Sequence, residues 1–467
     1  MRKIIALFLC CVFSFLCISC GTQNAEEIVP DYFSGIEGDI DLDGKNFVFA
    51  VVADYFFEGE DNTLSYINNT EFADLAAERL REVSKRHNCT FEFKTVNRAG
   101  EAAYMDVAAG TYSLDIIQEE SYWLVSYIPM GIFVDLTTLD NIDVTDEAKW
   151  GNRNLLASTM WNGAVYGVVP AQHPLRTQNS VSGVIAINED YVSMLNTTDP
   201  RDYYENGEWT WDTFTKVLTD YDLTSLGGEK VYAFASDESR FARSVAFSNG
   251  DRYFTYNEDG TFELGLYSPT TLDALNQFYE WLNGPTSDNI LIMEGLPALI
   301  DGLAVLGNVE AFEVLANTDS IAYNLNNFGI IPYPSGPDAD PGWYQNYCES
   351  TDFTICIPIT APDPEATAVF LNAIYEPFEG YETSEDIIDY LHSNYFLDRR
   401  DAEFFYSLSD ADHTYFFPTM DGIFGIWNSF LVSKPSEALE KEENIQYTVA
   451  EKQLVSRAKT ISDVYID

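Results

Sequence analysis

Phe47-Val-Phe-Ala-Val-Val52 is a continuous apolar run, and it opens the stretch of sequence that decides the fold. Such a run is typical of a strand buried on both faces of a parallel sheet. Residues 71–87 follow with apolar side chains at helical spacing, and residues 90–96 alternate as a second strand. Residues 101–109 indicate a second helix and residues 114–117 a third strand. Strand, helix, strand, helix, strand predicts a doubly wound α/β fold.

The later part of the chain has a mixed pattern. A helix is expected from Trp209 to Leu218, with Thr210 or Asp212 as its cap. A hairpin is expected over residues 253–264, because Asn257-Glu-Asp-Gly260 lies between β-rich flanks. Further helices are expected over residues 272–282, 364–375 and 448–464.

The composition excludes several classes of function. The 467-residue chain has 75 Asp and Glu against 25 Lys and Arg, a formal charge of −50. So acidic a surface repels phosphate groups, and nucleic acids or anionic membrane faces are not expected as partners. No glycine-rich phosphate loop follows the first strand, and four His leave little material for a His-built metal site.

The N-terminus has the pattern of an export signal. Met1-Arg2-Lys3 is basic, and residues 4–18 are almost entirely apolar. This run is shorter than the roughly 20 residues that a transmembrane helix needs, and its shape is that of a secretory signal. Ser19-Cys20-Gly21 resembles a bacterial lipobox, which implies that residues 1–19 are removed and Cys20 is lipidated. An ordinary cleaved signal peptide is the alternative.

Residues 20–44 are polar and acidic and are expected to form a tether behind the lipid. Asp39, Asp41 and Asp43 stand there at alternate positions, as in the first half of a calcium loop. The closing Glu of such a loop would fall at position 50, which is Ala50. A solvated acidic linker is therefore the alternative to a calcium site.

Cysteine usage leaves one candidate disulfide bond. Cys348 and Cys356 lie close enough in sequence to close a small loop outside the cell. Two separate buried thiols are the alternative. No C-x-x-C spacing occurs, so a zinc site has no support.

Short motifs follow one another in a fixed order along the chain. Residues 108–117 read AAGTYSLDII, and residues 165–170 read VYGVVP. The others are GIFVDL at 131–136, WTWDTF at 209–214, NEDGTF at 257–262, GIIPYPSGP at 329–337 and PEATAVFL at 364–371. In this order they resemble the family 1 extracellular solute-binding proteins of ABC importers, the maltose-binding-protein type. The chain departs from that family's pattern in lacking Pro before Asp115, and its C-terminal part matches loosely.

The resemblance implies a two-lobed, periplasmic-binding-protein-like α/β fold, in which each lobe is a mixed sheet flanked by helices and a hinge joins the lobes. It places the N-terminal lobe at residues 45–170 and 335–365, and the C-terminal lobe at 171–334 and 366–467. An extracellular solute, most simply a carbohydrate, would be captured in the interlobe cleft and delivered to an ABC permease. The protein is then expected to be a monomer, lipid-anchored to the bacterial cell membrane, with no catalytic role and no cofactor.

A sugar site needs aromatic platforms and planar polar side chains, and in α/β lobes these lie past the carboxyl ends of strands. Asp54 and Tyr55 follow the first strand, and Glu119, Glu120, Tyr122 and Trp123 follow the third. Gln172, His173 and Arg176 follow the Pro170 crossing, Asp301 follows Leu299-Ile300, and Trp343 and Tyr344 lie in a proline-rich loop. Trp427 falls where the family often places a stacking aromatic. Core packing is the alternative for each aromatic, as expected of Trp209 and Trp211, and a solvated surface is the alternative for each carboxylate.

Two other functions stay open on the sequence. A glycoside hydrolase would need two carboxylates roughly 5–9 Å apart, which so acidic a chain could supply. No G-x-S-x-G or H-E-x-x-H motif points to another hydrolase. A surface glycan-binding lipoprotein would pass sugar to a different uptake system, but the strand-rich first part of the chain argues against such a mostly helical protein. The solute itself is not fixed by the sequence, since peptides and other polar solutes fit the same scaffold.

Overall fold

The first sheet forms where the sequence predicts it. In the computed structural model β1 pairs in parallel with β4 and β5, and β17 joins β5 antiparallel. The strand order is β17-β5-β1-β4, and the predicted doubly wound series is confirmed. The bounds are Asn46–Val51 for β1, Thr90–Thr95 for β4, Ile116–Glu120 for β5 and Phe353–Cys356 for β17, with α2 at Glu71–Arg86 and α3 at Ala99–Ala109.

The structure describes residues 40–408 and 414–416, apart from short internal gaps. The gaps are 53–56, 121–122, 125–126, 151–155, 157–158, 162–163, 171–180, 196, 222–229, 251–253, 257–261, 265–267, 316–318, 341–343, 345 and 349–352. The expected signal peptide, Cys20, Asp39 and the helix over 448–464 lie outside the described residues. Within the described part, no helix is long and apolar enough to cross a membrane.

Alternate residues of β1 serve opposite faces of the first sheet. Phe47 and Phe49 lie in the cluster that α2 and α15 (Pro364–Ile374) cover, while Ala50 lies in the cluster that α3 covers. Phe47 stacks on Phe370 of α15 with 4.6 Å between the ring centroids. The continuous apolar run of β1 is therefore explained by a strand that is covered on both sides.

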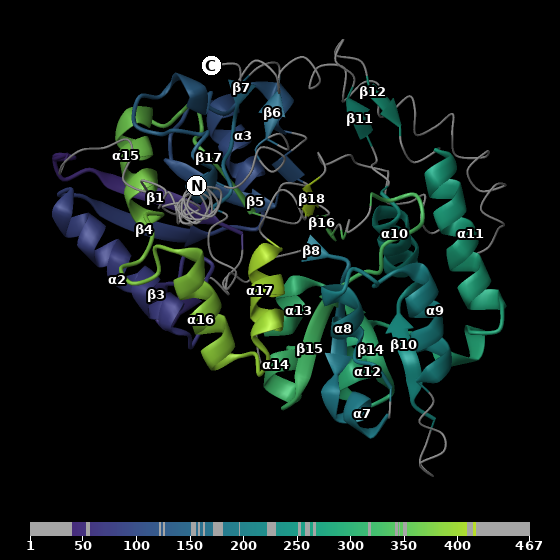
Figure 1. Ribbon diagram of the computed structural model, residues 1–467. Helices are drawn as coiled ribbons and strands as arrows, with labels where there is room; N and C mark the ends of the chain where they lie inside the picture. The colour runs from purple at the N-terminus through teal and green to yellow at the C-terminus, as the bar shows by residue number, and fades with distance from the viewer. Residues whose placement is uncertain are drawn as a thin grey trace, which may run out of the picture.

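The second sheet has five strands in the order β13-β10-β14-β9-β15. β10 is parallel to β13 and β14, and β9 is antiparallel to β14 and β15. We call the body around the first sheet the first lobe and the body around this sheet the second lobe (Figure 1). The bounds are Val184–Asn188 for β9, Tyr232–Ser236 for β10, Ile290–Ile292 for β13, Ala304–Val309 for β14 and Phe328–Pro332 for β15.

An aromatic core covers one face of the second sheet, beneath α9 (Trp211–Asp220), α10 (Glu238–Ser248) and α11 (Pro269–Asn283). Trp209 and Trp211 are buried there, and their Nε1 atoms donate to Pro332 O at 2.8 Å and Ser248 Oγ at 3.1 Å. The prediction that both tryptophans pack in the core is confirmed. α9 begins with a capping box at Thr210, so Thr210 rather than Asp212 is the cap.

A three-stranded sheet of order β18-β16-β8 lies between the lobes (Figure 1). Its strands are β8 (Val181–Ser182), β16 (Asn346–Cys348) and β18 (Thr414–Phe416). Nearby, Val168 and Ile355 exchange backbone hydrogen bonds of 3.0 and 2.8 Å. The VYGVVP motif and β17 thus run side by side where the chain crosses between lobes.

Two C-terminal helices attach to different lobes. Tyr390 of α16 (Ser384–Asn394) makes an edge contact with Phe72 of α2, at 5.0 Å between centroids. Asp401 of α17 (Arg399–Ser407) accepts a 2.9 Å hydrogen bond from the backbone N–H of Ile330 in β15. The α16–α17 pair therefore connects the two lobes. It does so beside β15, an edge strand of the second sheet.

The lobe boundary expected at residue 365 does not fit the packing of α15. That helix was expected to begin the C-terminal lobe, but it packs on α2 and on Phe47 of the first sheet. The contact joins residues that are far apart in sequence, so local pattern does not show it. We place α15 with the first lobe; the other boundaries stay a prediction.

The remaining elements connect these bodies. The expected hairpin over 253–264 is confirmed by the antiparallel pairing of β11 with β12. The bounds are Phe57–Glu58 (β2), Asp61–Asn62 (β3), Ile128–Met130 (η2), Leu136–Thr138 (η3), Glu147–Trp150 (α5), Met160–Trp161 (β6), Ala164–Val165 (β7), Glu189–Met194 (α7), Pro200–Glu205 (α8), Phe254–Tyr256 (β11), Phe262–Leu264 (β12), Ser287–Asn289 (η6), Gly295–Ile300 (α12), Ala311–Leu315 (α13) and Ile321–Asn324 (α14).

Candidate functional site

The topology of the first sheet sets where a ligand is expected. From β1 the chain passes through α2 to β4 on one side, and from β4 it passes through α3 to β5 on the other side of β1. The strand order therefore reverses between β1 and β5, and ligands of open α/β sheets bind beside the carboxyl ends of strands at such a point. Glu119, Glu120 and Trp123 lie at this end of β5, whereas Asp54, Tyr55 and Tyr122 lie outside the described residues.

Glu119 is fully buried and holds the N-terminus of α3. Its Oε2 accepts from the backbone N–H of Ala99 at 2.7 Å and of Gly100 at 3.4 Å. The N-cap residue of that helix, Arg98, makes no side-chain cap bond, so a carboxylate from β5 supplies the cap. Burial raises the pKa of Glu119, and the hydrogen bonds from Gly100 and Ala99 act against that rise. Glu119 is therefore a positioning residue.

Trp123 is held between a cation and a carboxylate. The guanidinium carbon of Arg98 lies 3.9 Å from the centroid of the Trp123 ring, and Trp123 Nε1 donates to Glu120 Oε2 at 2.8 Å. The Arg98 side chain is 38% exposed, and Trp123 and Glu120 are half-buried. The result is an aromatic ring, a carboxylate and a guanidinium that reach solvent at the switch point.

Tyr127 completes this group on the α3 side. A Cβ atom on Gly100 would lie 2.7 Å from Cδ2 of Tyr127, so glycine at this position lets the ring approach the first turn of α3. The Tyr127 ring also lies 6.5 Å from that of Tyr104. We call Arg98, Glu119, Glu120, Trp123 and Tyr127 the switch cluster.

Sequence reasoning missed Arg98, although a usable signal was present. Arg98 follows the carboxyl end of β4, just as Trp123 follows that of β5. The rule that selected Trp123 would therefore have selected Arg98 as well.

The second lobe presents a charged group toward the crossing strands. Val184 opens β9 directly after β8, and it pairs with Val309 at the carboxyl end of β14. That end of the sheet therefore lies on the side of β8 and β16. Arg240 of α10 lies there, 3.1 Å from Glu310 and 3.0 Å from Glu313.

This second-lobe cluster is completed by Asp237, 3.6 Å from Arg240. Burial raises the pKa of Glu310, and Arg240 acts in the opposite direction. Asp237 follows β10 and Glu310 follows β14, so both lie beyond carboxyl ends of parallel strands. Sequence reasoning missed them because it took Leu299-Ile300, rather than residues 304–309, as the nearby strand.

The sequence comparison gives the family. The family model of bacterial extracellular solute-binding proteins matches residues 79–391. The chain belongs to the bacterial extracellular solute-binding proteins. Members of this family are receptors rather than enzymes, and they act outside the cytoplasm. No curated protein sequence matches the chain.

Solved structures show the same two-lobed fold. A cyclo/maltodextrin-binding protein complexed with maltotetraose is 14% identical, with a TM-score of 0.56 over 92% of this chain and 96% of that one. UgpB from Mycobacterium tuberculosis in complex with glycerophosphocholine is 15% identical, with a TM-score of 0.58 over 90% and 100%. The maltose-binding periplasmic protein MalE from Listeria monocytogenes in complex with maltose is 12% identical, with a TM-score of 0.55 over 88% and 99%. The predicted fold class is confirmed.

Two other predicted ligand residues of this solute-binding protein, Asp301 and Tyr344, lie in the second lobe, apart from the switch cluster. Asp301 is the C-cap of α12 and precedes β14, so it lies at the amino end of that strand, opposite to the end that bears Glu310. Leu299-Ile300 ends a helix rather than a strand, so the carboxyl-end rule that selected Asp301 does not apply to it. Tyr344 packs edge-on against Tyr204 of α8 at 4.8 Å, in agreement with the packing alternative. Gln172, His173, Arg176, Trp343 and Trp427 lie outside the described residues.

The metal and disulfide candidates have structural roles where they are described. Asp41 Oδ1 accepts from Asn88 Nδ2 at 2.8 Å and from the backbone N–H of Asp43 at 2.9 Å, and these bonds lower its pKa. Among the described residues, no group of three or more His, Cys, Asp or Glu is placed to hold a metal ion. Cys356 is a free, buried thiol in β17, which agrees with separate thiols rather than a bridge to Cys348.

Proposed function

We propose that this protein is the solute receptor of an ABC importer and that it captures a carbohydrate, most favourably an oligosaccharide, between its lobes. The observation that carries the proposal is the arrangement of Arg98, Trp123 and Glu120 at the topological switch of the first sheet. This one place combines an aromatic platform with two planar groups of opposite charge.

The chemistry of that arrangement suits a sugar. An indole ring covers the C–H face of a pyranose, and the contact removes apolar surface of both partners from water. The Glu120 carboxylate accepts hydrogen bonds from hydroxyl groups, and the Arg98 guanidinium donates to them. Because Arg98 and Glu120 also hold the indole, little side-chain freedom remains to be lost when a solute binds.

The second lobe would supply the opposing wall. Arg240, Glu310 and Glu313 lie at the end of the second sheet that adjoins β8 and β16. In such a group the opposite charges compensate one another. Individual oxygen and nitrogen atoms can therefore form hydrogen bonds with a neutral polyol, and no uncompensated charge is exposed. Closing the lobes on a sugar would then bring two hydrogen-bonding walls together.

The similar structures favour a carbohydrate over other solutes. Two of them hold maltotetraose and maltose. The third holds glycerophosphocholine, so the same fold accepts a different class of solute and the test must include one.

Delivery to a permease agrees with the expected anchor. Ser19-Cys20-Gly21 would place a lipid at Cys20, and the acidic stretch up to residue 44 would act as a tether. A tether raises the effective concentration of a receptor beside its membrane partner. The proposal therefore describes a monomeric receptor on the outer side of the bacterial cell membrane.

Calorimetric titration against maltodextrins, other glycans, peptides and glycerophosphocholine tests the proposal. A glycan is expected to bind the parent, and Trp123→Ala is expected to weaken that binding severalfold. Tyr323→Ala is the matched control, because Tyr323 is an exposed aromatic on α14 of the second lobe. Equal affinity in the parent and in Trp123→Ala would reject the placement of the site. Hydrolysed glycan that accumulates with protein amount and time would reject the receptor in favour of a glycoside hydrolase.

A further inference from the structure

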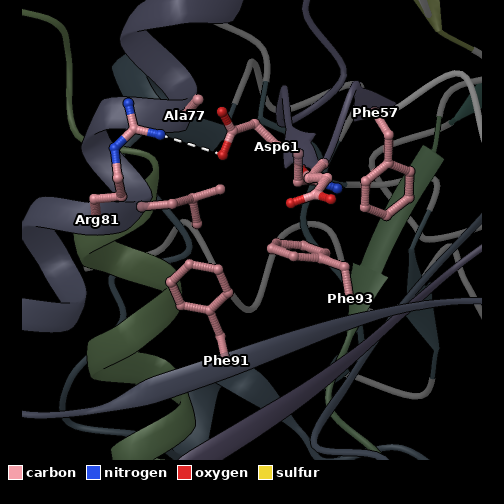
Figure 2. A pocket seen from close by; sticks show the side chains of 9 residues that line it. Phe57, Asp61, Ala77, Arg81, Phe91 and Phe93 are labelled. Atoms are coloured by element: carbon pink, nitrogen blue, oxygen red, sulfur yellow. Dashed lines mark hydrogen bonds and ion pairs between the residues drawn. The ribbon is translucent and has the colours of Figure 1, made fainter.

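A pocket of about 200 Å³ lies between the β2–β3 hairpin, α2 and the edge strand β4 (Figure 2). It is on the α2 face of the first sheet, whereas the switch cluster lies beside α3 on the other face. The proposed function above assigns no role to it.

Phenyl rings form the floor of the pocket. Phe91 and Phe93 of β4 and Phe57 of β2 are half-buried. Phe93 makes edge contacts with Phe91 and Phe57, at centroid distances of 5.7 and 6.3 Å. None of the three rings is fully buried, so each keeps part of its surface accessible. The floor therefore offers aromatic surface to a ligand.

Asn62 is a lining residue of the pocket with an almost fully buried side chain. The residue is 6% exposed, and its Oδ1 accepts from the backbone N–H of Leu64 at 2.8 Å. That bond fixes the orientation of the amide, because a backbone N–H needs an oxygen acceptor. Among the residues that the structure describes, the Nδ2 atom then has no hydrogen-bond partner. A buried donor without a partner is costly, and a ligand acceptor in the pocket would satisfy it.

An exposed ion pair forms the rim. Arg81 of α2 lies 3.2 Å from Asp61 of β3, and Figure 2 shows the two side chains reaching toward each other across the pocket. Both side chains are more than half exposed, so they are accessible to a ligand. The rim therefore supplies donors and acceptors side by side.

The polar groups of the pocket select against charged ligands. The donors of Asn62 and Arg81 disfavour an organic cation, although three phenyl rings alone would suit one. The carboxylates of Asp61 and Glu60 disfavour an anion. A neutral ring with an apolar face and several hydroxyl groups satisfies every part of the lining. The volume is below the roughly 300–1,000 Å³ of sites for drug-sized ligands, so a single ring fits better than a chain of rings.

We propose that this pocket binds one neutral pyranose, as a second carbohydrate site outside the interlobe cleft. The phenyl rings contact the C–H face of the sugar. Asn62 Nδ2 donates to a ring or hydroxyl oxygen, and Asp61 and Arg81 bind outward-facing hydroxyl groups. The inference does not depend on the proposed interlobe solute, because the two sites share no residue.

Ligand-observed saturation-transfer NMR on the full chain tests the pocket. The probes are glucose, mannose, galactose and N-acetylglucosamine, with glucuronate and choline as charged comparisons. Asn62→Asp keeps the acceptor for the Leu64 N–H and removes the donor, so it is expected to weaken the bound neutral sugar about 3- to 10-fold. Phe57→Leu is expected to weaken it severalfold and decides the matter if Asn62→Asp does not fold. Glu92→Gln, on the opposite face of β4, is the matched control and is expected to bind like the parent.

Three outcomes overturn the proposal. The first is that none of the four neutral sugars binds the parent. The second is that choline or glucuronate binds more tightly than every neutral sugar. The third is that Asn62→Asp and Phe57→Leu bind like the parent while Trp123→Ala abolishes binding, which would place the sugar at the switch cluster. Failure of the interlobe proposal would instead show as oligosaccharide titrations that Trp123→Ala leaves unchanged.

Discussion

The guanidinium of Arg98 lies over the ring of Trp123, with 3.9 Å between the guanidinium carbon and the ring centroid. The contact joins the start of α3, which follows β4, to the segment after β5, so it connects the strands on either side of β1 at their carboxyl ends. A ring held in this way keeps one orientation, and Glu120 fixes its edge through the indole N–H. The Arg98–Trp123 pair is therefore both a packing contact of the first lobe and part of its proposed solute-binding site.

Arg98→Lys is expected to weaken solute binding severalfold and to change stability little. Lysine keeps the positive charge but loses the planar stack on the indole, and a cation–π contact at an exposed site contributes about 0.5–1 kcal/mol. Calorimetric titration gives the affinity and chemical denaturation gives the stability. Arg399→Lys, in an exposed network on α17, serves as the control. Parent-like affinity in Arg98→Lys would show that stacking does not orient the site.

Glu119→Ala is expected to lower the free energy of unfolding by about 1–3 kcal/mol, because two backbone donors at the start of α3 lose their acceptor. Glu119→Gln keeps an oxygen that can accept from Ala99 and is expected to lie between the parent and the alanine variant. Urea denaturation measures both. If the two variants are equally destabilised, the charge rather than the hydrogen bond supports α3.

Asp401 is expected to make stability fall as the pH rises from 4 to 7. Burial raises the pKa of Asp401 to about 7, and Arg201, 2.9 Å away, acts in the opposite direction. The folded protein then holds this proton over a range in which the unfolded chain has released it, near pH 4. The folded state binds more protons there, so this group's contribution to the free energy of unfolding decreases with rising pH.

Asp401→Asn removes that contribution and is expected to make the melting temperature less dependent on pH between 4 and 7. The asparagine oxygen can still accept from the Ile330 N–H. Glu189 and Asp398 also face Arg201, at 2.5 and 3.8 Å, so the arginine keeps carboxylate partners. Asp389→Asn, an exposed residue of α16, is the control. A variant with the same pH slope as the parent would contradict the assignment.

Cys20 is expected to carry diacylglycerol and to be the first residue of the mature chain, because Ser19-Cys20-Gly21 follows the apolar run. Mass spectrometry of protein extracted from membranes checks this. Cys20→Ser is expected to release the protein into the medium or the periplasm. An intact N-terminal peptide that spans Cys20 without lipid would reject the anchor.

The sequence predicted the first lobe well because its signals are local. The apolar run at residues 47–52 and the helical spacing of residues 71–87 each depend on near neighbours along the chain. The packing of Phe370 on Phe47 joins residues far apart in sequence, and this contact moved α15 to the first lobe. Short apolar pairs were also ambiguous, and Leu299-Ile300 proved to end a helix.

The candidate site was predicted in part for the same reason. The rule on carboxyl ends selected Glu119, Glu120 and Trp123, but it did not separate a capping carboxylate from one that reaches solvent. Glu119 differs from Glu120 through its hydrogen bonds to the start of α3, which no local pattern shows. The pocket at Asn62 was missed because its donor is positioned by a turn in which Leu64 and Ser65 have positive φ.

The most direct test of the central claim is calorimetric titration of the parent and of Trp123→Ala with the best-binding glycan, followed by analysis of the recovered glycan. We predict saturable binding by the parent, an affinity about fivefold weaker in Trp123→Ala, as expected for about 1 kcal/mol from an aromatic contact, and a glycan recovered unchanged. Equal affinities in the two proteins, or recovery of cleaved glycan, would contradict the account.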